Sequence, residues 1–568
     1  MKKTRGFLCM KKRLVLFTSI FLVLALVITG CSTPAEEPAG PPAEQPGEEP
    51  AEQPSESTDK KVLRTNNSSE PGSLDPPLAQ GTHESWVLEN AFEGLMTFDE
   101  NGDLVEGMAE SYEVSEDGLT YTFKLRDDIR WTNGDPVTAE DFAFSWKRAL
   151  APETAANYAS IVYSIKGGEA YNTGEGSADD VMVTALDEKT LEVTLETPTA
   201  YFLELTAFYT YFPVNKSVVE ANPDWAKDPS TYVSNGPFKL TEWKHNDQLI
   251  LEKNEDYYNV DKIHLDVIDL DILEDQNTAW QKYLGGEYDL LVDIPTTVVN
   301  QLQVNNDPEL EIGMQVGTYY YNVNPAVKPF NNAKVRTGIS MALDRQTIVD
   351  KVSMGGQIPA VGVVPPGLQD ENGDDFREVV GDLIQYDVAE AKRLFDEGLA
   401  EEGMTLDQFN GSGFVLLYNT SESHKKIAQA AQEMWREALG IELGLENVEF
   451  QVKLDREQSG DYQISRAGWI GDFMDPMTFL DLWWSDSAFN DVRYDNAEYD
   501  ALILEAKGTN DQEVRMAAMK EAEAILMEDM PVIPVYFYTQ PYTVKPEVSG
   551  IFKVPVRYPV ITYADIAQ

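Results

Sequence analysis

The segment ISRAGWIGDFMDP, residues 464–476, brings two opposite charges and an aromatic side chain close together in the sequence. Arg466 and Asp472 stand near the ends of this segment, Trp469 lies between them, and Gly468 and Gly471 supply flexible positions. A guanidinium can bind an anion and a carboxylate can bind a cation, so both side chains could hold charged groups of a ligand. They could also pair with each other in a salt bridge, and their spacing alone leaves both possibilities open.

Catalytic and metal-binding signatures do not accompany this segment. The chain has 4 histidines, and none of them has the paired spacing of a zinc site. We find no nucleophile elbow, no phosphate-binding loop and no dinucleotide fingerprint. The two DENGD segments, at 99 and at 370, carry glycine at the fourth position instead of the sixth, which predicts tight turns rather than calcium loops. We therefore expect no metal and no cofactor, and binding is favoured over catalysis, with a secreted peptidase as the alternative.

Composition restricts the class of partner. The chain of 568 residues is longer than one hydrophobic core usually serves, which predicts two or three domains. It carries 97 acidic against 44 basic residues, a formal net charge of -53. Such a charge repels a nucleic-acid backbone, so a nucleic-acid partner is excluded.

The N-terminus predicts export and lipid anchoring. A basic start and the apolar run LVLFTSIFLVLALVI are typical of a signal peptide, 1–30, whether translation begins at Met1 or at Met10. The following ITGC resembles a lipobox, so Cys31 should become a diacylated N-terminus; an uncleaved membrane anchor is the alternative. Residues 31–61 are rich in proline and glutamate and predict a disordered tether. We expect the protein at the outer face of the cytoplasmic membrane, with no thiol left for a disulfide.

Local patterns predict a mixed α/β body after the tether. Alternating apolar residues predict strands at 119–126, 191–196 and 263–273. Thr138 followed by Asp141 predicts a capped helix start, and residues 424–440 have helical spacing and stop at Gly440. Ser421 and Ser423 are both cap candidates, which would place His424 in the first helical turn. Two further amphipathic stretches are 333–352 and 512–530.

Several segments together resemble one known family. They are SEDGLTYTFKLRDDIRWTNGDPVTAEDFAFSWKR, SNGPFKL, EKNEDYYN, FNNAKVRTGISMALDRQTIV and RAGWIGDFMDP. In this order they are similar to extracytoplasmic solute-binding proteins of the peptide and nickel ABC importer class, in particular the oligopeptide-binding branch, from about residue 62 to the C-terminus. The resemblance implies an α/β, periplasmic-binding-protein-like fold of two lobes and an extra domain around a hinged cleft. It implies domain I at 62–96, 217–316 and 537–568, domain II at 97–216 and domain III at 317–536.

The resemblance also implies roles for residues of the opening segment. Asp472 matches the position that binds the α-amino group of a peptide, and Arg466 matches a cation that faces the carboxylate end. Together they would bracket a zwitterion, whose charges are costly to bury without partners. The backbone at Gly468, Trp469 and Ile470 resembles a strand that pairs with the peptide main chain, and the Trp469 ring would form a pocket wall.

Other positions match more weakly. Glu84 matches a ligand contact, and Ser85 and Trp86 match an opposite backbone strand, although a solvated turn would explain the three residues as well. His424 matches a position facing the carboxylate of longer peptides, against a purely structural role at a helix start. Phe450 stands where the branch carries a tryptophan, which preserves an apolar wall and removes an indole donor.

The predicted function is that of a lipid-anchored, monomeric receptor without enzymatic activity. It would capture short peptides with free termini and deliver them to permease subunits driven by cytoplasmic ATPases. The alternatives keep the fold and change the cargo to a nickel complex, a glutathione-like compound, or a cell-wall or signalling peptide. A surface adhesin or chaperone is a further alternative. Peptide length, side-chain preference and the permease are not determined by the sequence.

Overall fold

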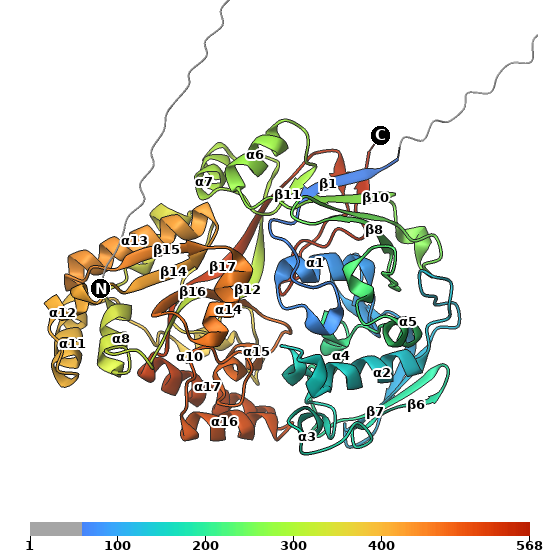
Figure 1. Ribbon diagram of the computed structural model, residues 1–568, viewed down its shortest axis with the longest axis horizontal. Coiled ribbons are helices and arrows are strands. Elements are labelled where there is room, and N and C mark those ends of the chain that lie inside the picture. Colours follow the sequence, from blue (N-terminus) through green and yellow to red (C-terminus); the bar gives the residue numbers. More distant parts are fainter. Residues whose placement is uncertain (1–59, 568) are drawn as a thin grey trace, which may run out of the picture. The chain divides into compact units, whose positions relative to one another are not determined.

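Helices and strands alternate along residues 60–567, the part of the chain that the computed structural model describes (Figure 1). The predicted signal peptide, Cys31 and nearly all of the predicted tether lie outside these residues. Within 60–567, no helix combines the length and the apolar character that a membrane crossing requires. The fold is of the mixed α/β class that the sequence predicts.

The three longest helices, α11, α13 and α17, lie in the second half of the described chain. The helix bounds are α1 Thr82–Ala91, α2 Ala139–Leu150, α3 Gly168–Asn172, α4 Phe202–Leu205, α5 Lys216–Ala221, α6 Gln276–Leu284, α7 Thr296–Asn305, α8 Ala333–Met341, α9 Arg345–Ile348, α10 Phe376–Val380, α11 Val388–Glu401, α12 Leu406–Gly411, α13 Glu422–Leu439, α14 Phe450–Ser459, α15 Met477–Leu480, α16 Ala497–Lys507 and α17 Gln512–Asp529.

The strands include two that are much longer than the others, β12 and β17. The bounds are β1 Val62–Asn66, β2 Met96–Phe98, β3 Leu104–Glu106, β4 Ala109–Val114, β5 Thr120–Leu125, β6 Val183–Asp187, β7 Thr190–Thr194, β8 Phe238–Lys244, β9 Gln248–Lys253, β10 Val267–Asp271, β11 Leu290–Leu291, β12 Leu310–Val323, β13 Ile358–Pro359, β14 Val415–Asn419, β15 Gly444–Val448, β16 Ile464–Ile470, β17 Val532–Val544, β18 Val548–Ser549 and β19 Asp565–Ile566.

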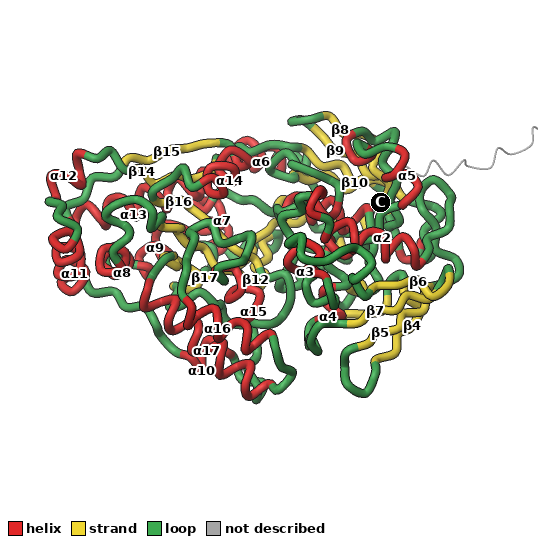
Figure 2. Tube along the Cα trace, turned by 60° about the horizontal axis from the view of Figure 1, so that its bottom comes forward, coloured by secondary structure: helices red, strands yellow, loops and turns green. Residues whose placement is uncertain are grey.

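Three larger sheets organise the described body. One has the order β1-β10-β9-β8, a second has the order β4-β5-β7-β6, and the third runs β11-β17-β12-β16-β14-β15 with β13 on β17. In Figure 2 the strands β4 to β7 lie at one end of the view, and β14 and β15 lie at the other. The boundaries of the three predicted domains remain a prediction, because β12 passes through position 316 and β17 passes through position 536 without a break.

Local sequence signals explain where several elements begin and end. The Asp141 carboxylate accepts hydrogen bonds from the Thr138 N–H at 3.0 Å and hydroxyl at 2.8 Å, so α2 starts where the sequence predicts. Strand β5 buries Tyr121, Phe123 and Leu125 in alternation. The predicted stretch 333–352 is not one helix. Asp344 accepts the Thr347 N–H at 2.9 Å and caps a new helix, α9, after α8 has ended.

Candidate binding site

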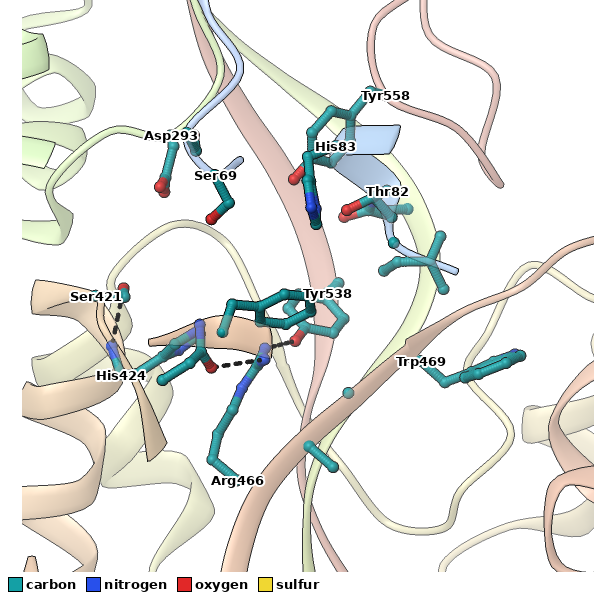
Figure 3. Close-up of a pocket in the computed structure, with 18 of the residues that line it drawn as sticks. Ser69, Thr82, His83, Asp293, Ser421, His424, Arg466, Trp469, Tyr538 and Tyr558 are labelled. Atoms are coloured by element: carbon teal, nitrogen blue, oxygen red, sulfur yellow. Dashed lines mark hydrogen bonds between the residues drawn. The ribbon is translucent and has the colours of Figure 1, made fainter. Parts of the chain in front are cut away.

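A cavity of about 390 Å³ lies among segments that are far apart in the sequence. Its walls come from β12, β16 and β17, from the N-terminal ends of α1 and α13, from one side of α14, and from loops around residues 67–69, 157–158, 292–296 and 488–491. Arg466, Trp469 and Asp472 all belong to the lining. Figure 3 shows part of this cavity, with Arg466 near its centre and Asp293 and His83 on the side opposite β16.

Strand β16 is paired along its whole length on one edge and at two residues on the other. On the first edge it runs antiparallel to β12, with register pairs from Gly317 opposite Ile470 to Val323 opposite Ile464. On its other edge β14 pairs only with Ile464 and Ser465. The part of β16 from 466 to 470 therefore presents an unpaired strand edge to the cavity, where an extended ligand could add a strand.

Gly468 lies in the middle of this strand edge and leaves no space for a side chain. A Cβ at this position would lie 2.5 Å from the Tyr538 hydroxyl and 3.2 Å from Nη2 of Arg466. Glycine is thus the residue that lets Arg466 and Tyr538 approach each other beside the strand.

Arg466 is held in the cavity by neutral groups. Its Nη2 donates to the Tyr538 hydroxyl at 2.7 Å, its Nη1 donates to Oδ1 of Asn419 at 3.4 Å, and the guanidinium lies 4.7 Å from the Tyr319 ring centroid (Figure 3). No carboxylate of residues 60–567 lies within ion-pair distance of it. The cation is therefore positioned by polar and aromatic partners, with its charge available to an anion.

Asp472 lies just beyond the end of β16 and is anchored by its backbone. Its N–H donates to the Thr478 hydroxyl at 2.9 Å, while its carboxylate forms no ion pair with any described residue. Burial, and then repulsion from Asp481, raise the pKa of Asp472 well above its usual range, and a hydrogen bond from Tyr158 offsets part of this. The salt bridge between Arg466 and Asp472, one of the two sequence-based alternatives, is not formed.

Trp469 and Arg466 leave β16 on opposite sides (Figure 3). The indole of Trp469 lies 5.9 Å from the Tyr158 ring in a stacked arrangement and 4.9 Å from the Phe489 ring in an edge arrangement, centroid to centroid. Its Nε1 has no hydrogen-bond partner among the described residues. These aromatic rings form a wall of the cavity on this side of the strand.

His424 lies in the first turn of α13, as the sequence predicts. The His424 N–H donates to the capping Ser421 hydroxyl at 3.4 Å, and the helix ends at Gly440 with a φ of +75°. Burial, and then the charges of Arg466 and Lys453, lower the pKa of His424 well below its usual range. The imidazole that faces the cavity is therefore neutral at physiological pH and can offer a hydrogen bond but no positive charge.

Phe450 is the first residue of α14 and also lines the cavity. Its ring meets His83 edge-on, with 5.4 Å between the centroids. Since His83 belongs to α1, this contact joins the two sides of the cavity.

Two positions matched from the family do not line the cavity. Glu84 is buried, with 3% of the residue exposed. Its carboxylate accepts hydrogen bonds from four backbone N–H groups, those of Gly72 at 2.7 Å, Ser73 at 3.1 Å, Gln80 at 2.8 Å and Gly81 at 2.5 Å. Its hydrogen-bonding capacity is used within the fold, so Glu84 stabilises the loop that precedes α1.

Trp86 is buried in the same way, and its indole donates to the Pro559 carbonyl at 2.9 Å. Ser85 does line the cavity, but it and Trp86 belong to α1. Their backbone groups serve a helix, and the expected opposite backbone strand is not formed at these residues.

The sequence analysis missed several residues of the cavity. Tyr538 and Asn419 hold Arg466, Tyr158 contacts Trp469 and Asp472, and the charged Lys453 and Asp491 line one side. Tyr536 and Tyr538 on β17 alternate with Phe537, and β12 carries three consecutive tyrosines at 319–321. These two aromatic runs are a signal that could have predicted a paired aromatic wall.

Comparison with known proteins gives a consistent result over most of the chain. Residues 103–491 match the model of the bacterial extracellular solute-binding proteins, family 5 (middle region). The oligopeptide-binding protein OppA of Bacillus subtilis is 42% identical over 504 residues, covering 87% of this chain and 91% of that protein. The solved structure of Listeria monocytogenes OppA bound to peptide superposes with a TM-score of 0.83 at 31% identity, covering 90% of this chain and all of the other.

Two solved structures of the murein tripeptide binding protein MppA of Escherichia coli distinguish conformations. One superposes with a TM-score of 0.82, and the unliganded open form superposes with 0.60, both at 32% identity over 90% of this chain. The present structure therefore differs from the open arrangement, although the sequence similarity to both is the same.

Proposed function

Because this chain belongs to the bacterial extracellular solute-binding proteins of family 5, in the oligopeptide-binding branch that serves peptide ABC importers, we propose that it captures short peptides outside the cell and passes them to a membrane permease. Members of this family are substrate-binding proteins, and the chain is a binding protein rather than an enzyme. The observation that carries the proposal is a cavity that contains an unpaired strand edge, together with a cation and a carboxylate for which residues 60–567 supply no counter-charge.

The charges of the cavity suit the two ends of a short peptide. A buried ammonium or carboxylate without a partner costs several kcal/mol, roughly, so a receptor has to supply both counter-charges. Asp472 has an uncompensated carboxylate for the α-ammonium, and Arg466 has an uncompensated guanidinium for the carboxylate end. The backbone from Gly468 to Ile470 offers N–H and C=O groups that every peptide can pair with, whatever its side chains.

Predicted domains II and III are in direct contact. The rings of Tyr201 and Phe473 stack with 4.0 Å between the centroids, the Met474 N–H donates to Oε2 of Glu204 at 2.8 Å, and the Thr197 hydroxyl donates to the Lys507 carbonyl at 2.8 Å. A peptide that bridges both sides would bind this closed state preferentially and shift the population toward it. The strands β12 and β17 would serve as the hinge, since they continue from predicted domain I into domain III.

Native mass spectrometry of the purified chain, followed by denaturing release and sequencing of the bound material, tests the peptide-binding function. We expect a mixture of short peptides with free amino and carboxyl termini, because the proposed site binds the charged termini and the main chain of a peptide and not one particular side chain. A single non-peptide compound, a metal complex, or a cavity that stays empty when peptides are added would contradict the proposal.

We further place the protein at the outer face of the cytoplasmic membrane, tethered through a diacylated Cys31. The support is the sequence alone, ITGC after a signal-peptide-like start and before a proline-rich segment. Two acyl chains give stable anchoring, whereas one gives only reversible binding. C31S is expected to move the protein from the membrane fraction to the soluble fraction, as measured by immunoblotting after cell fractionation. A C31S variant that stays in the membrane would instead favour an uncleaved anchor.

A further inference from the structure

Acidic side chains outnumber basic ones around the cavity. Besides two histidines, the lining holds five carboxylates and two cations: Glu274, Asp293, Glu457, Asp472 and Asp491 against Lys453 and Arg466. If Asp472 and Arg466 take the two ends of a peptide, the remaining groups still carry more negative than positive charge. A ligand that brings additional positive charge would balance them.

One of the remaining acids is neutralised inside the protein. Lys453 and Glu457 stand one turn apart on α14 and form an ion pair, with side chains that are 4% and 2% exposed. The Asn322 amide donates to the same carboxylate at 3.4 Å. This pair is complete, so Lys453 is already engaged by Glu457.

Asp491 has no such partner. Among residues 60–567, its carboxylate takes part in no ion pair and accepts no hydrogen bond, whereas its backbone carbonyl accepts the Tyr462 hydroxyl at 3.0 Å. Burial, and then the negative charge of Glu457, raise the pKa of Asp491 to about 7, while Lys453 and Arg493 lower it. A half-buried carboxylate that faces a cavity without a donor is poorly stabilised until a cation arrives.

The surroundings of Asp491 fit a long basic side chain. Tyr320 lies opposite Ala467 in the register of β12 and β16, so its side chain leaves the sheet on the same face as Trp469, away from Arg466. Phe489 precedes Asp491 by two residues and meets the Trp469 ring. These rings line the same cavity as Asp491, and burial, then the charges of Glu457 and Asp491, raise the pKa of Tyr320 well above its usual range. Aromatic rings beside a carboxylate suit the methylene stem and the charge of lysine or arginine.

From this geometry we propose that the Asp491 carboxylate binds a lysine or arginine side chain of the bound peptide, so that the receptor favours basic peptides. The inference rests on the proposed function, because an extended peptide paired with β16 turns alternate side chains to the Trp469 face. One position of the peptide should then show the preference, and its immediate neighbours should not.

Isothermal titration calorimetry with a panel of tripeptides tests this assignment. Each position of trialanine is replaced in turn by lysine or by norleucine, which keeps most of the stem and lacks the charge. At one position, the lysine peptide is expected to bind the purified chain about tenfold or more tightly than the norleucine peptide. D491N should abolish this preference, so that the lysine and norleucine peptides bind the variant with similar affinity. Measurable binding of both peptides also shows that the variant is folded.

D495N is the matched control, because Asp495 is an exposed aspartate four residues away that does not line the cavity. It should keep the full preference for lysine. Equal binding of lysine and norleucine peptides at every position, or a preference that survives in D491N, would overturn the role of Asp491 while the proposed function stands. Failure of every tripeptide to bind would contradict the proposed function itself.

The preference should also depend on pH. The group that must be ionised is Asp491, and the charges that face it are Glu457 and Lys453 from α14 and Arg493 from its own loop. Since its pKa is about 7, the ratio of lysine to norleucine affinity should rise between pH 6 and pH 8 as the carboxylate loses its proton. In D491N the ratio should stay constant over this range, and a wild-type ratio independent of pH would contradict the assignment.

Discussion

Replacing Asp472 by asparagine is expected to weaken the binding of peptides with a free amino terminus by about 10- to 150-fold. The substitution keeps the shape of the side chain and removes the charge that would hold the α-ammonium. A hydrogen bond to a charged group contributes roughly 1.5 to 3 kcal/mol, which corresponds to this range of affinity. The loss is larger if the ammonium is left buried without a counter-charge. Isothermal titration calorimetry of the purified chain with trialanine measures the effect.

Acetylating the peptide provides the control for this prediction. The wild-type chain should bind acetyl-trialanine much more weakly than trialanine, whereas D472N should bind the two with similar affinity. A double-mutant cycle of this kind isolates the contact between Asp472 and the amino terminus. If D472N loses affinity equally for both peptides, the carboxylate acts on the fold of the site and does not bind the ammonium.

Binding should also release protons. Burial and Asp481 raise the pKa of Asp472 well above its usual range, so the empty site is protonated more often than an exposed aspartate. An arriving ammonium favours the ionised carboxylate and displaces that proton. Calorimetry in two buffers of different ionisation enthalpy should therefore report a release of protons that D472N lacks.

The second large effect concerns stability. Replacing Glu523 by glutamine is expected to lower the free energy of unfolding by about 3 to 5 kcal/mol, the cost of breaking a buried ion pair on one side. Oε1 of Glu523 accepts three hydrogen bonds. The donors are Nη1 of Arg377 at 2.5 Å and the backbone N–H groups of Val363 and Val364 at 2.8 and 2.9 Å. The side chains of Arg377 and Glu523 are 6% and 0% exposed, so the variant leaves the guanidinium buried without its counter-charge. Urea denaturation followed by circular dichroism measures the change.

Glu521 offers a matched control on the same helix. It is exposed and forms no ion pair within the described residues, so E521Q should change the free energy of unfolding by less than about 0.5 kcal/mol. The double variant R377M/E523M should be more stable than E523Q, because two apolar side chains leave no charge buried. A double variant as unstable as E523Q would show that the backbone N–H groups of 363 and 364, rather than the guanidinium, need the carboxylate.

Features that depend on neighbouring residues were predicted from the sequence. The start of α2 at Thr138 and the limits of α13 between Ser421 and Gly440 follow from side-chain caps and a left-handed glycine, which act within a few residues. The strand at 468–470 came from the resemblance, and the structure places these residues at the end of β16, Ile464–Ile470. The family and its fold were predicted correctly in the same way.

Features that depend on distant segments were not predicted. The role of Glu84 changes because the loop before α1 folds back and directs four backbone N–H groups at its carboxylate. The contrast between a paired Glu457 and an unpaired Asp491 arises only when α14 and a loop meet beside β16. Neither spacing nor a family motif contains this information, because both arise from the three-dimensional packing of separate segments.

The central position of β17 has a consequence for the order in which the molecule forms. This strand lies between β11 and β12 in its sheet, and it pairs residues 532–544 with partners as early as Leu290. Such distant pairing has to wait until the intervening chain is available, and it slows folding. A nascent chain that lacks its last forty residues can form the sheet of β4 to β7, but it has no β17 to pair with residues 310–314 of β12 and lacks Tyr536 and Tyr538 from the cavity. The ligand site is thus completed only after almost the whole chain has emerged, so that partly synthesised chains cannot trap a ligand.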